Sequence, residues 1–570
     1  MDIYEKLKQK PFSLNESQLQ WVRENFEQMR LEDKVGQLFF LCARFEMDWL
    51  DHVFSICEPG GIMFRRMPLE GAYHIAETLT EKPKVPMLLA ADLERGGNCI
   101  VSDVGTQIGS PMAVAATGKS ENAYRLGEIC ALEASAINAN WAFAPIIDID
   151  YNFRNPITNV RTFGSDPERV KEFGTEFVKG VQAHGMAATV KHFPGDGRDE
   201  RDQHIAMTIN DLDCDEWMAS YGAAYKSAID AGVLTVMVGH IMQPAWSRKL
   251  RPGIKDEEIL PATLSPELLQ GLLRGELGFN GLIVTDATTM VGFNAAMPRR
   301  KSVPGAIAAG ADIFLFPKNL EEDYQYMMDG IRDGLVTEER IDEAVLRILG
   351  LKAALKLYDK KMPTLESAKK IIGCKEHHEF AAKCMDEAIT LVKEQKGVLP
   401  ISPERYPRVM IYPLEKDKDT TGFNKFLGSQ ACSQFIEKVK ERGFEVSVFE
   451  PKMGMEGMYQ PTTAITKACD LIIYVADLPT MSNQTQVRIN WAPPIGCNCP
   501  IYTHEVPTIF ISLENPYHLL DAPRVPTYIN TYSNTPEALD AVLDKLMGKS
   551  EFKGKSPVDP FCGKWDTHLS

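Results

Sequence analysis

Short apolar runs recur through the first 317 residues of the chain, and longer helical patterns separate most of them. Continuous runs of four to seven apolar residues are typical of strands that are buried on both faces. The predicted strands cover residues 35–41, 61–64, 87–91, 141–147, 187–190, 234–238, 282–285 and 313–316. The predicted helices between them cover residues 71–79, 123–138, 167–184, 216–231, 266–277 and 299–309.

Eight strands that alternate with helices over this length predict a (β/α)₈ barrel. A doubly wound parallel sheet is the alternative arrangement of the same elements. A further helical pattern over residues 340–357 would complete the outer ring of the barrel. We therefore expect a barrel domain over residues 1–357.

The pattern restarts after a Lys-rich connection over residues 358–375. A helix is predicted over 380–393, with strands over 409–412, 446–449, 471–476, 508–513 and 528–532 and helices over 421–442, 462–468 and 536–547. This alternation predicts a second domain over residues 376–570, an open and mostly parallel α/β sandwich. The domain has no glycine-rich phosphate loop, which argues against nucleotide binding.

Polar residues follow five of the predicted barrel strands at their carboxyl ends, where a barrel carries its active site. They are Asp92 and Glu94, Asp148 and Asp150, Lys191 and His192, His240, and Asp286. One segment, residues 191–204, gathers a cation, two imidazoles and several carboxylates in what reads as a loop. Such residues suit a polar substrate and a proton transfer, although a solvated loop has the same composition.

Composition narrows the class of protein. The net charge of −16 over 570 residues argues against a nucleic-acid partner. No apolar stretch is long enough to span a membrane, and the first residues lack the apolar region of a signal peptide. The twelve cysteines are scattered, so we expect reduced thiols and a cytoplasmic protein. Cys497 and Cys499 lack the further ligands of a zinc site.

Several motifs together resemble the glycoside hydrolases of family 3, in their β-N-acetylglucosaminidase branch. Residues 191–197 read Lys-His-Phe-Pro-Gly-Asp-Gly, and Asp202 and His204 follow. Further similar motifs, in the family's order, lie at residues 140–148, 161–167, 277–287, 389–393 and 399–400. The likeness covers most of residues 30–550. It implies the same two-domain fold and hydrolysis of a glycosidic bond.

By this resemblance Asp286 is the nucleophile, and His204 is the general acid and base, held by Asp202. A carboxylate at a strand end can attack an anomeric carbon, and an imidazole titrates near neutral pH. Aspartate is also a favoured helix N-cap, which is the structural alternative for Asp286. For His204 the alternatives are a surface histidine or a metal ligand.

The resemblance also implies that Asp92, Arg161, Lys191 and His192 hold the hydroxyl groups of the sugar. Charged side chains make strong, directional hydrogen bonds of the kind that a pyranose needs. As alternatives, Asp92 would pair with a neighbouring arginine such as Arg95, and Arg161 would only bridge loops.

Three positions depart from the family pattern near the sugar. Asp196 stands where the family usually has histidine, Gln203 replaces serine between the two dyad residues, and Arg95 interrupts the motif that follows the third strand. These departures leave the nature of the sugar and of the aglycone open.

We therefore expect a retaining β-N-acetylhexosaminidase that acts on a glycoside or oligosaccharide substrate, with no metal and no organic cofactor. Three alternatives stay open: a β-N-acetylglucosaminide phosphorylase, a β-glucosidase of the same family, and a non-catalytic sugar-binding protein. The sequence carries no signal for the oligomeric state.

Overall fold

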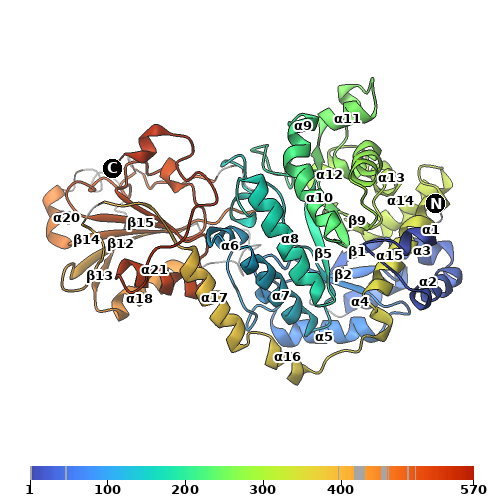
Figure 1. Ribbon diagram of the computed structural model, residues 1–570, viewed down its shortest axis with the longest axis horizontal. Coiled ribbons are helices and arrows are strands. Elements are labelled where there is room, and N and C mark those ends of the chain that lie inside the picture. The colour runs from blue at the N-terminus through green and yellow to red at the C-terminus, as the bar shows by residue number, and fades with distance from the viewer. Residues whose placement is uncertain are drawn as a thin grey trace. The chain divides into compact units, whose positions relative to one another are not determined.

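The computed structural model describes residues 3–44, 48–395, 397–415, 430–450, 459, 461–483, 485, 487–493 and 496–569. The chain divides into two compact units (Figure 1). The first unit comprises residues 1–107, 120–158 and 166–377. The second comprises residues 378–570 together with two short segments, 108–119 and 159–165.

The first unit is an eight-stranded parallel barrel, as predicted. Its strands pair in the order β10-β1-β2-β3-β4-β5-β7-β9, and all their pairings are parallel. A parallel bridge between Val284 and Ile313 joins the two end strands and nearly closes the barrel. The strands are β1 (Phe39–Cys42), β2 (Gly61–Met63), β3 (Leu88–Ala91), β4 (Trp141–Ala142), β5 (Ala187–Phe193), β7 (Thr235–Val238), β9 (Leu282–Thr285) and β10 (Phe314–Leu315).

Side chains fill the inside of this barrel. Trp141 is fully buried, and its indole N–H lies 2.8 Å from the hydroxyl of Thr189 and 2.9 Å from that of Thr235. Phe40 and Phe143 pack their rings against the same indole. The interior is therefore a packed core, which leaves the loops at the carboxyl ends of the strands to form a site.

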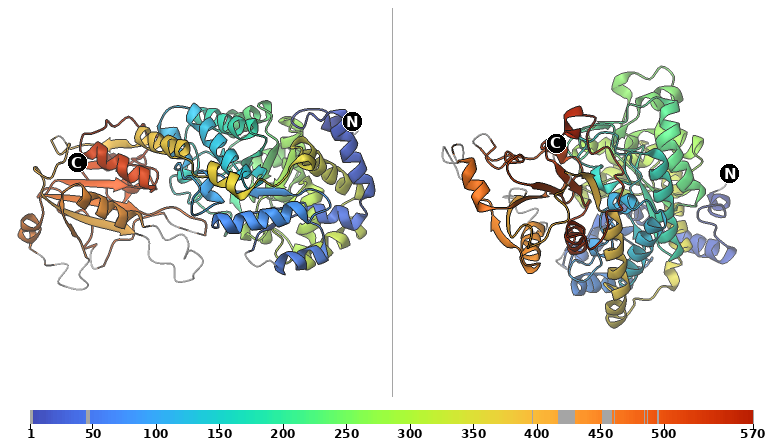
Figure 2. Two further views of the ribbon diagram at one scale, coloured as in Figure 1. Left: turned by 90° about the horizontal axis from the view of Figure 1, so that it is seen from below. Right: turned by 60° about the vertical axis from the view of Figure 1, so that its left-hand side comes forward.

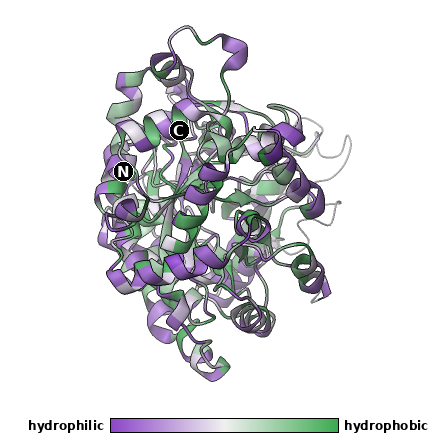
Figure 3. Ribbon diagram, turned by 90° about the vertical axis from the view of Figure 1, so that its right-hand side faces the viewer, coloured by the Kyte–Doolittle hydropathy of each residue, from purple (hydrophilic) through white to green (hydrophobic). Residues whose placement is uncertain are grey.

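Helices surround the strands (Figure 1). Many residues of these helices are hydrophilic (Figure 3). The ring includes α4 (Asp48–Ile56), α5 (Leu69–Glu81), α7 (Glu121–Ser135), α8 (Pro167–Ala183), α10 (Ala223–Asp230), the π-helical η6 (Glu267–Glu276), α13 (Arg299–Ala309), α14 (Leu320–Arg332) and α15 (Glu338–Ala354). The amino-terminal helices α1 (Ile3–Leu7), α2 (Glu16–Gln28) and α3 (Leu31–Gln37) precede the first strand. None of the described helices is both long and apolar enough to cross a membrane.

The structure corrects three of the predicted elements. The first half of the run at 35–41 belongs to α3, because its apolar residues also fit a helical face. Strand β5 continues to Phe193, so Lys191 and His192 stand on the strand rather than in the loop after it. The helix predicted over 380–393 is α17 (Lys375–Ala388), and its last residues form strand β11 (Thr390–Lys393).

The second unit contains the predicted mostly parallel sheet, in the order β11-β16-β15-β14-β12-β13. Among the described strands of this sheet, only β11 runs antiparallel to its neighbour. The other strands are β12 (Arg408–Glu415), β13 (Glu445–Val448), β14 (Leu471–Asp477), β15 (Thr508–Ser512) and β16 (Thr527–Asn530). The first part of the helix predicted over 421–442 lies outside the described residues, and the remainder is α18 (Ala431–Glu441).

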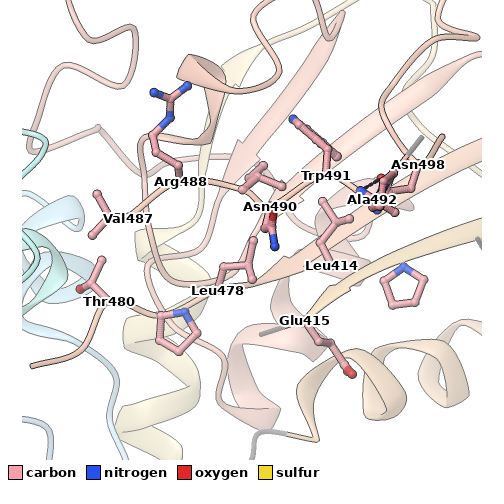
Figure 4. A pocket seen from close by; sticks show the side chains of 14 residues that line it. Leu414, Glu415, Leu478, Thr480, Val487, Arg488, Asn490, Trp491, Ala492 and Asn498 are labelled. Carbon is pink, nitrogen blue, oxygen red and sulfur yellow. Dashed lines mark hydrogen bonds between the residues drawn. The ribbon is translucent and has the colours of Figure 1, made fainter. Parts of the chain in front are cut away.

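Two hydrophobic layers cover this sheet, whose strands and flanking helices are seen in Figure 2. The helices α18 and α21 (Pro536–Leu546) pack on one face, and α20 (Thr462–Ala468) packs on the other. A cavity of about 790 Å³ opens where β12 and β14 end, and Leu414, Leu478 and Trp491 are among the residues that line it (Figure 4).

Candidate active site

The polar residues that follow the barrel strands share one face of the first unit, because the strands are parallel and their carboxyl ends meet there. Asp286 follows β9 directly and is buried. Its backbone N–H donates to the carbonyl of Val238 at 2.8 Å, and its Oδ1 accepts from the N–H of Ala287 at 2.7 Å. The next helix, α12 (Val291–Asn294), begins five residues later, so Asp286 is not a helix N-cap.

Three imidazoles hold the Asp286 carboxylate in its ionised form. Burial by itself would raise the pKa of Asp286, but the charges of His192, His240 and His204 and the Ala287 amide lower it below its usual value. The carboxylate Oδ2 lies 4.0 Å from His192 Nε2. A buried carboxylate that remains ionised is what a nucleophile requires.

Asp148 orients His192 next to this carboxylate. The Nδ1–H of His192 donates to Asp148 Oδ2 at 2.7 Å, and the His192 backbone N–H donates to Asp148 Oδ1 at 3.0 Å. Because Nδ1 is bonded to a carboxylate, Nε2 is the ring atom that faces Asp286. The ring is almost fully buried, so its position is set by these contacts.

Asp202 and His204 form a second carboxylate–imidazole pair. His204 Nδ1 lies 2.7 Å from Asp202 Oδ1, and the His204 backbone N–H donates to the same oxygen at 2.8 Å. Asp202 is fully buried, whereas the His204 side chain is 25 % exposed. His204 Nε2 is therefore the atom that can exchange a proton with a substrate, and the charge of His204 acts on Asp286.

The loop that carries His204 is joined to the loop that carries Asp286. The carbonyls of Gln203 and His204 accept from Gly292 and Val291, which open α12. The side-chain oxygen of Gln203 accepts from the backbone N–H of His240 at 2.8 Å. The two loops are thus held in register by backbone hydrogen bonds.

His240 links the two loops, because it contacts Gln203 in one and Ala287 in the other. Its Nε2 lies 3.0 Å from the carbonyl of Ala287, the residue next to Asp286, and must donate to it. Its Nδ1 lies 2.7 Å from the Thr263 hydroxyl. Burial lowers the pKa of His240, while the charge of Asp286 and the hydrogen bond to Ala287 act in the opposite direction. His240 therefore supports the candidate nucleophile without facing solvent.

Lys191 is buried between two carboxylates at the end of β5. Its ammonium lies 2.9 Å from Asp92 Oδ1 and 2.9 Å from Glu94 Oε1. Asp92 is half-exposed, so part of its carboxylate is accessible to a ligand. This arrangement offers alternating charged acceptors and donors, which suits the rim of a sugar.

Arg161 belongs to the second compact unit, at the end of the short helix η2 (Asn159–Arg161). Its part in binding the sugar remains a prediction.

Asp196 is a buried carboxyl group next to the Asp148–His192 pair. Its backbone N–H donates to Asp148 Oδ1 at 2.8 Å, and its Oδ1 accepts from Asn155 Nδ2 at 2.9 Å and from the Gly197 N–H at 2.7 Å. Among the described residues its Oδ2 has no hydrogen-bond partner. Burial is the main cause that raises the pKa of Asp196 to about 7, and the negative charge of Asp148 is the second.

This raised pKa predicts a dependence of stability on pH. The folded protein binds the Asp196 proton more tightly than the unfolded chain does, so stability is lost as the pH rises from 3.8 to about 7. Asp196→Asn keeps a neutral group. We therefore compare the melting temperatures of the variant and of wild type by scanning calorimetry at two pH values. The variant's melting temperature minus that of wild type should be larger at about pH 8 than at about pH 4.5, by on the order of 3 °C.

Asp211→Asn is the matched control for this measurement, because hydrogen bonding to Arg198 lowers the pKa of that exposed carboxylate. Its melting temperature relative to wild type should not rise over the same pH range. A constant difference between Asp196→Asn and wild type would contradict the burial of a neutral carboxyl group.

Sequence patterns identified the residues that follow the strands but missed how they are supported. Glu94 and Asp148 were noted as polar residues after strands and as parts of family-like motifs, and His240 as a polar residue after a strand, but none of them was given a role. A carboxylate beside a histidine motif on the neighbouring strand is the signal that points to Asp148. No sequence signal pairs Gln203 with His240, because the contact forms only when two loops meet.

The site combines an ionised carboxylate, an imidazole held by aspartate and a charged rim. Such a set can protonate a leaving oxygen and supply a nucleophile to the same substrate, which is the chemistry of retaining glycosidases.

Known proteins that are similar in sequence and structure carry the names of enzymes that act on glycosides. The chain is 50% identical to a "Beta-N-acetylglucosaminidase/beta-glucosidase" of Cellulomonas fimi, over 98% of this chain and 99% of that protein. It is similar in structure to a beta-glucoside phosphorylase, BglX, with a TM-score of 0.92 and 42% identity over 99% of both chains. A family 3 beta-N-acetylglucosaminidase from Paenibacillus sp. str. FPU-7 has a TM-score of 0.79 and 27% identity, over 93% of this chain and 99% of that one.

Residues 30–351, which span the barrel, match the model of the "Glycosyl hydrolase family 3 N terminal domain". This chain therefore belongs to glycoside hydrolase family 3 and is a glycosidase.

Proposed function

We propose that this glycosidase is a retaining β-N-acetylglucosaminidase in which Asp286 is the nucleophile and His204, held by Asp202, is the general acid and base. One observation carries the proposal. An ionised carboxylate and an aspartate-bound imidazole lie within electrostatic reach of each other at the carboxyl ends of the barrel strands. The name of the Cellulomonas fimi relative supports N-acetylglucosamine as the sugar, and that name includes β-glucosidase activity as well.

In the first step His204 Nε2–H protonates the glycosidic oxygen while an Asp286 oxygen bonds to the anomeric carbon. The bond to the leaving group breaks, and a glycosyl ester forms on Asp286. In the second step His204 Nε2 takes a proton from water, whose oxygen bonds to the anomeric carbon. The ester bond then breaks, and the free sugar keeps its β configuration.

Asp202 serves both steps by holding Nδ1–H. A carboxylate at that nitrogen fixes the tautomer, so that Nε2 alternates between donor and acceptor, and it stabilises the imidazolium that forms in the second step. Lys191, Asp92 and His192 are proposed to hold the sugar hydroxyls, together with Arg161. A cytoplasmic location stays a prediction.

Phosphorolysis is the second candidate, because the similar structure BglX is named a phosphorylase. A phosphate oxygen would then bond to the anomeric carbon of the glycosyl ester, and the bond to Asp286 would break. The products would be a sugar 1-phosphate and the restored carboxylate. A neutral imidazole repels an approaching anion less than a second carboxylate would.

One assay separates these possibilities. We expect the wild-type protein to cleave aryl β-N-acetylglucosaminide with a higher kcat/KM than aryl β-glucoside and to release N-acetylglucosamine in phosphate-free buffer. The products are identified by NMR with and without added phosphate. Accumulation of sugar 1-phosphate would show that the reaction is phosphorolysis and not hydrolysis. A higher kcat/KM for the glucoside would show that the preferred sugar is glucose and not N-acetylglucosamine. Cleavage of neither glycoside would refute the proposed function.

A further inference from the structure

A second cavity, of about 620 Å³, lies on the same face of the barrel as the proposed active site. It is formed where β1 and β10 end, and α4 and Arg65, the second residue after β2, also line it. Arg44, Arg65, His52 and Lys318 supply its charged lining, and Thr289 and Trp49 contribute as well. The proposed cleavage of a glycosidic bond uses none of these side chains.

The charge of this lining is opposite to that of the chain. The protein has 78 acidic and 62 basic residues, yet the described residues around the cavity include three cations and no carboxylate. Within the described chain Arg44, Arg65 and Lys318 form no ion pair with a carboxylate, and His52 lies 3.8 Å from Glu321 at the margin. Arg44, Arg65 and Lys318 are exposed, so solvent screens their mutual repulsion, and their combined positive potential would attract an anion into the cavity.

Arg65 is held in a way that leaves most of its guanidinium for a ligand. Its Nε donates to the Cys42 sulfur at 3.2 Å. Burial raises the pKa of the Cys42 thiol, so the partner of this bond is a neutral group. The two terminal nitrogens remain to donate a paired set of hydrogen bonds, the geometry with which arginine binds phosphate.

The cavity adjoins the proposed sugar site on two sides. Thr289 follows Asp286 by three residues, and the intervening Thr288 is bonded to the end of β10 through the carbonyls of Leu315 at 3.0 Å and Phe316 at 2.8 Å. On the other side, the charge of Asp92 acts on Cys42. An anion in this cavity would therefore be a neighbour of the bound sugar.

We propose that this cavity is a phosphate-binding subsite of the enzyme, with Arg44, Arg65 and Lys318 as its ligands. The inference rests on the proposed function only for what the phosphate does there. In many (β/α)₈ barrels the loops after the last strands bind phosphate. The phosphate is either inorganic phosphate that takes part in the reaction or a phosphate ester on the sugar of the substrate.

Binding is tested first without any glycoside, so that its result does not depend on the activity. Inorganic phosphate is titrated into wild type, the double variant Arg65→Gln/Lys318→Gln and the control Arg66→Gln by calorimetry at low ionic strength. Arg66 is exposed and adjoins Arg65 but does not line the cavity. We expect the double variant to bind phosphate about tenfold or more weakly than wild type and the control to bind it equally.

Two kinetic arms identify the source of the phosphate. If it is inorganic, added phosphate diverts the product of wild type and Arg66→Gln to sugar 1-phosphate, and the double variant loses this diversion. If it is an ester, wild type cleaves a phosphorylated aryl glycoside with a higher kcat/KM than the plain one, and the double variant loses the preference. Equal phosphate binding by wild type and double variant, or binding without either kinetic effect, would overturn the proposal.

Discussion

Replacing Asp286 with alanine is expected to reduce kcat/KM for aryl β-N-acetylglucosaminide by at least about 10³-fold, because no covalent intermediate can form. Its carboxylate follows β9, and the charges of His192, His240 and His204 favour its ionised form. Azide, a small anionic nucleophile, should restore part of the rate by taking the place of the lost carboxylate. Initial rates measure the loss, and NMR identifies the product, an α-glycosyl azide in place of the β sugar.

Asp211→Ala is the control for a change of charge, since Asp211 is exposed and pairs with Arg198. Its kcat/KM should equal that of wild type. Thermal melting of Asp286→Ala shows whether the barrel remains folded. A folded Asp286→Ala variant with near wild-type turnover would remove Asp286 from the mechanism, and a β-glycosyl azide would place the nucleophile elsewhere.

Replacing His204 with alanine is expected to act differently on the two steps. An aryl glycoside with a strongly acidic leaving phenol needs no protonation, so the first step remains fast. The second step still requires a base for water, and kcat should fall by about 10²- to 10⁴-fold. Because the glycosyl ester then accumulates, KM should fall as well, and a burst of phenol should precede slow turnover.

Mass spectrometry of the quenched His204→Ala variant should find the sugar on the peptide that contains Asp286. Asp202→Asn should show the same pattern with a smaller loss, because the imidazole is retained but less well oriented. His74→Ala, which changes an exposed histidine on α5, should leave both steps unaltered. An equal loss of rate for good and poor leaving groups, without a burst, would contradict the assignment of His204.

The barrel was predictable because its strands are buried on both faces, which produces continuous apolar runs. The run at 282–285 coincides with β9, and the helix predicted over 299–309 coincides with α13. One error arose where an apolar pattern fits two structures. Residues 35–41 suit both a strand and the inner face of a helix, and only packing against the barrel decides between them.

The candidate site was predictable in part, since the chemistry of Asp286, His204 and Asp202 follows from residue types at strand ends and from the resemblance to family 3. The structure places His204 Nδ1 2.7 Å from an oxygen of Asp202, two residues away, and the catalytic roles of the three residues stay predictions. Lys191 pairs with Glu94, which lies 97 residues away in the sequence. His192 pairs with Asp148, which lies 44 residues away. Pairings over such distances depend on how the strands are ordered in the barrel, which local patterns do not specify.

The sequence by itself determined the alternation of strands and helices, the face on which polar residues gather and the identities of the groups that can exchange a proton. Only the tertiary structure decided that Asp196 is buried beside Asp148, that His240 supports Asp286 from behind and that three cations line one cavity. The physical reason is that apolar periodicity is a local property. Burial of a charge and the meeting of like charges are properties of segments brought together from distant parts of the chain.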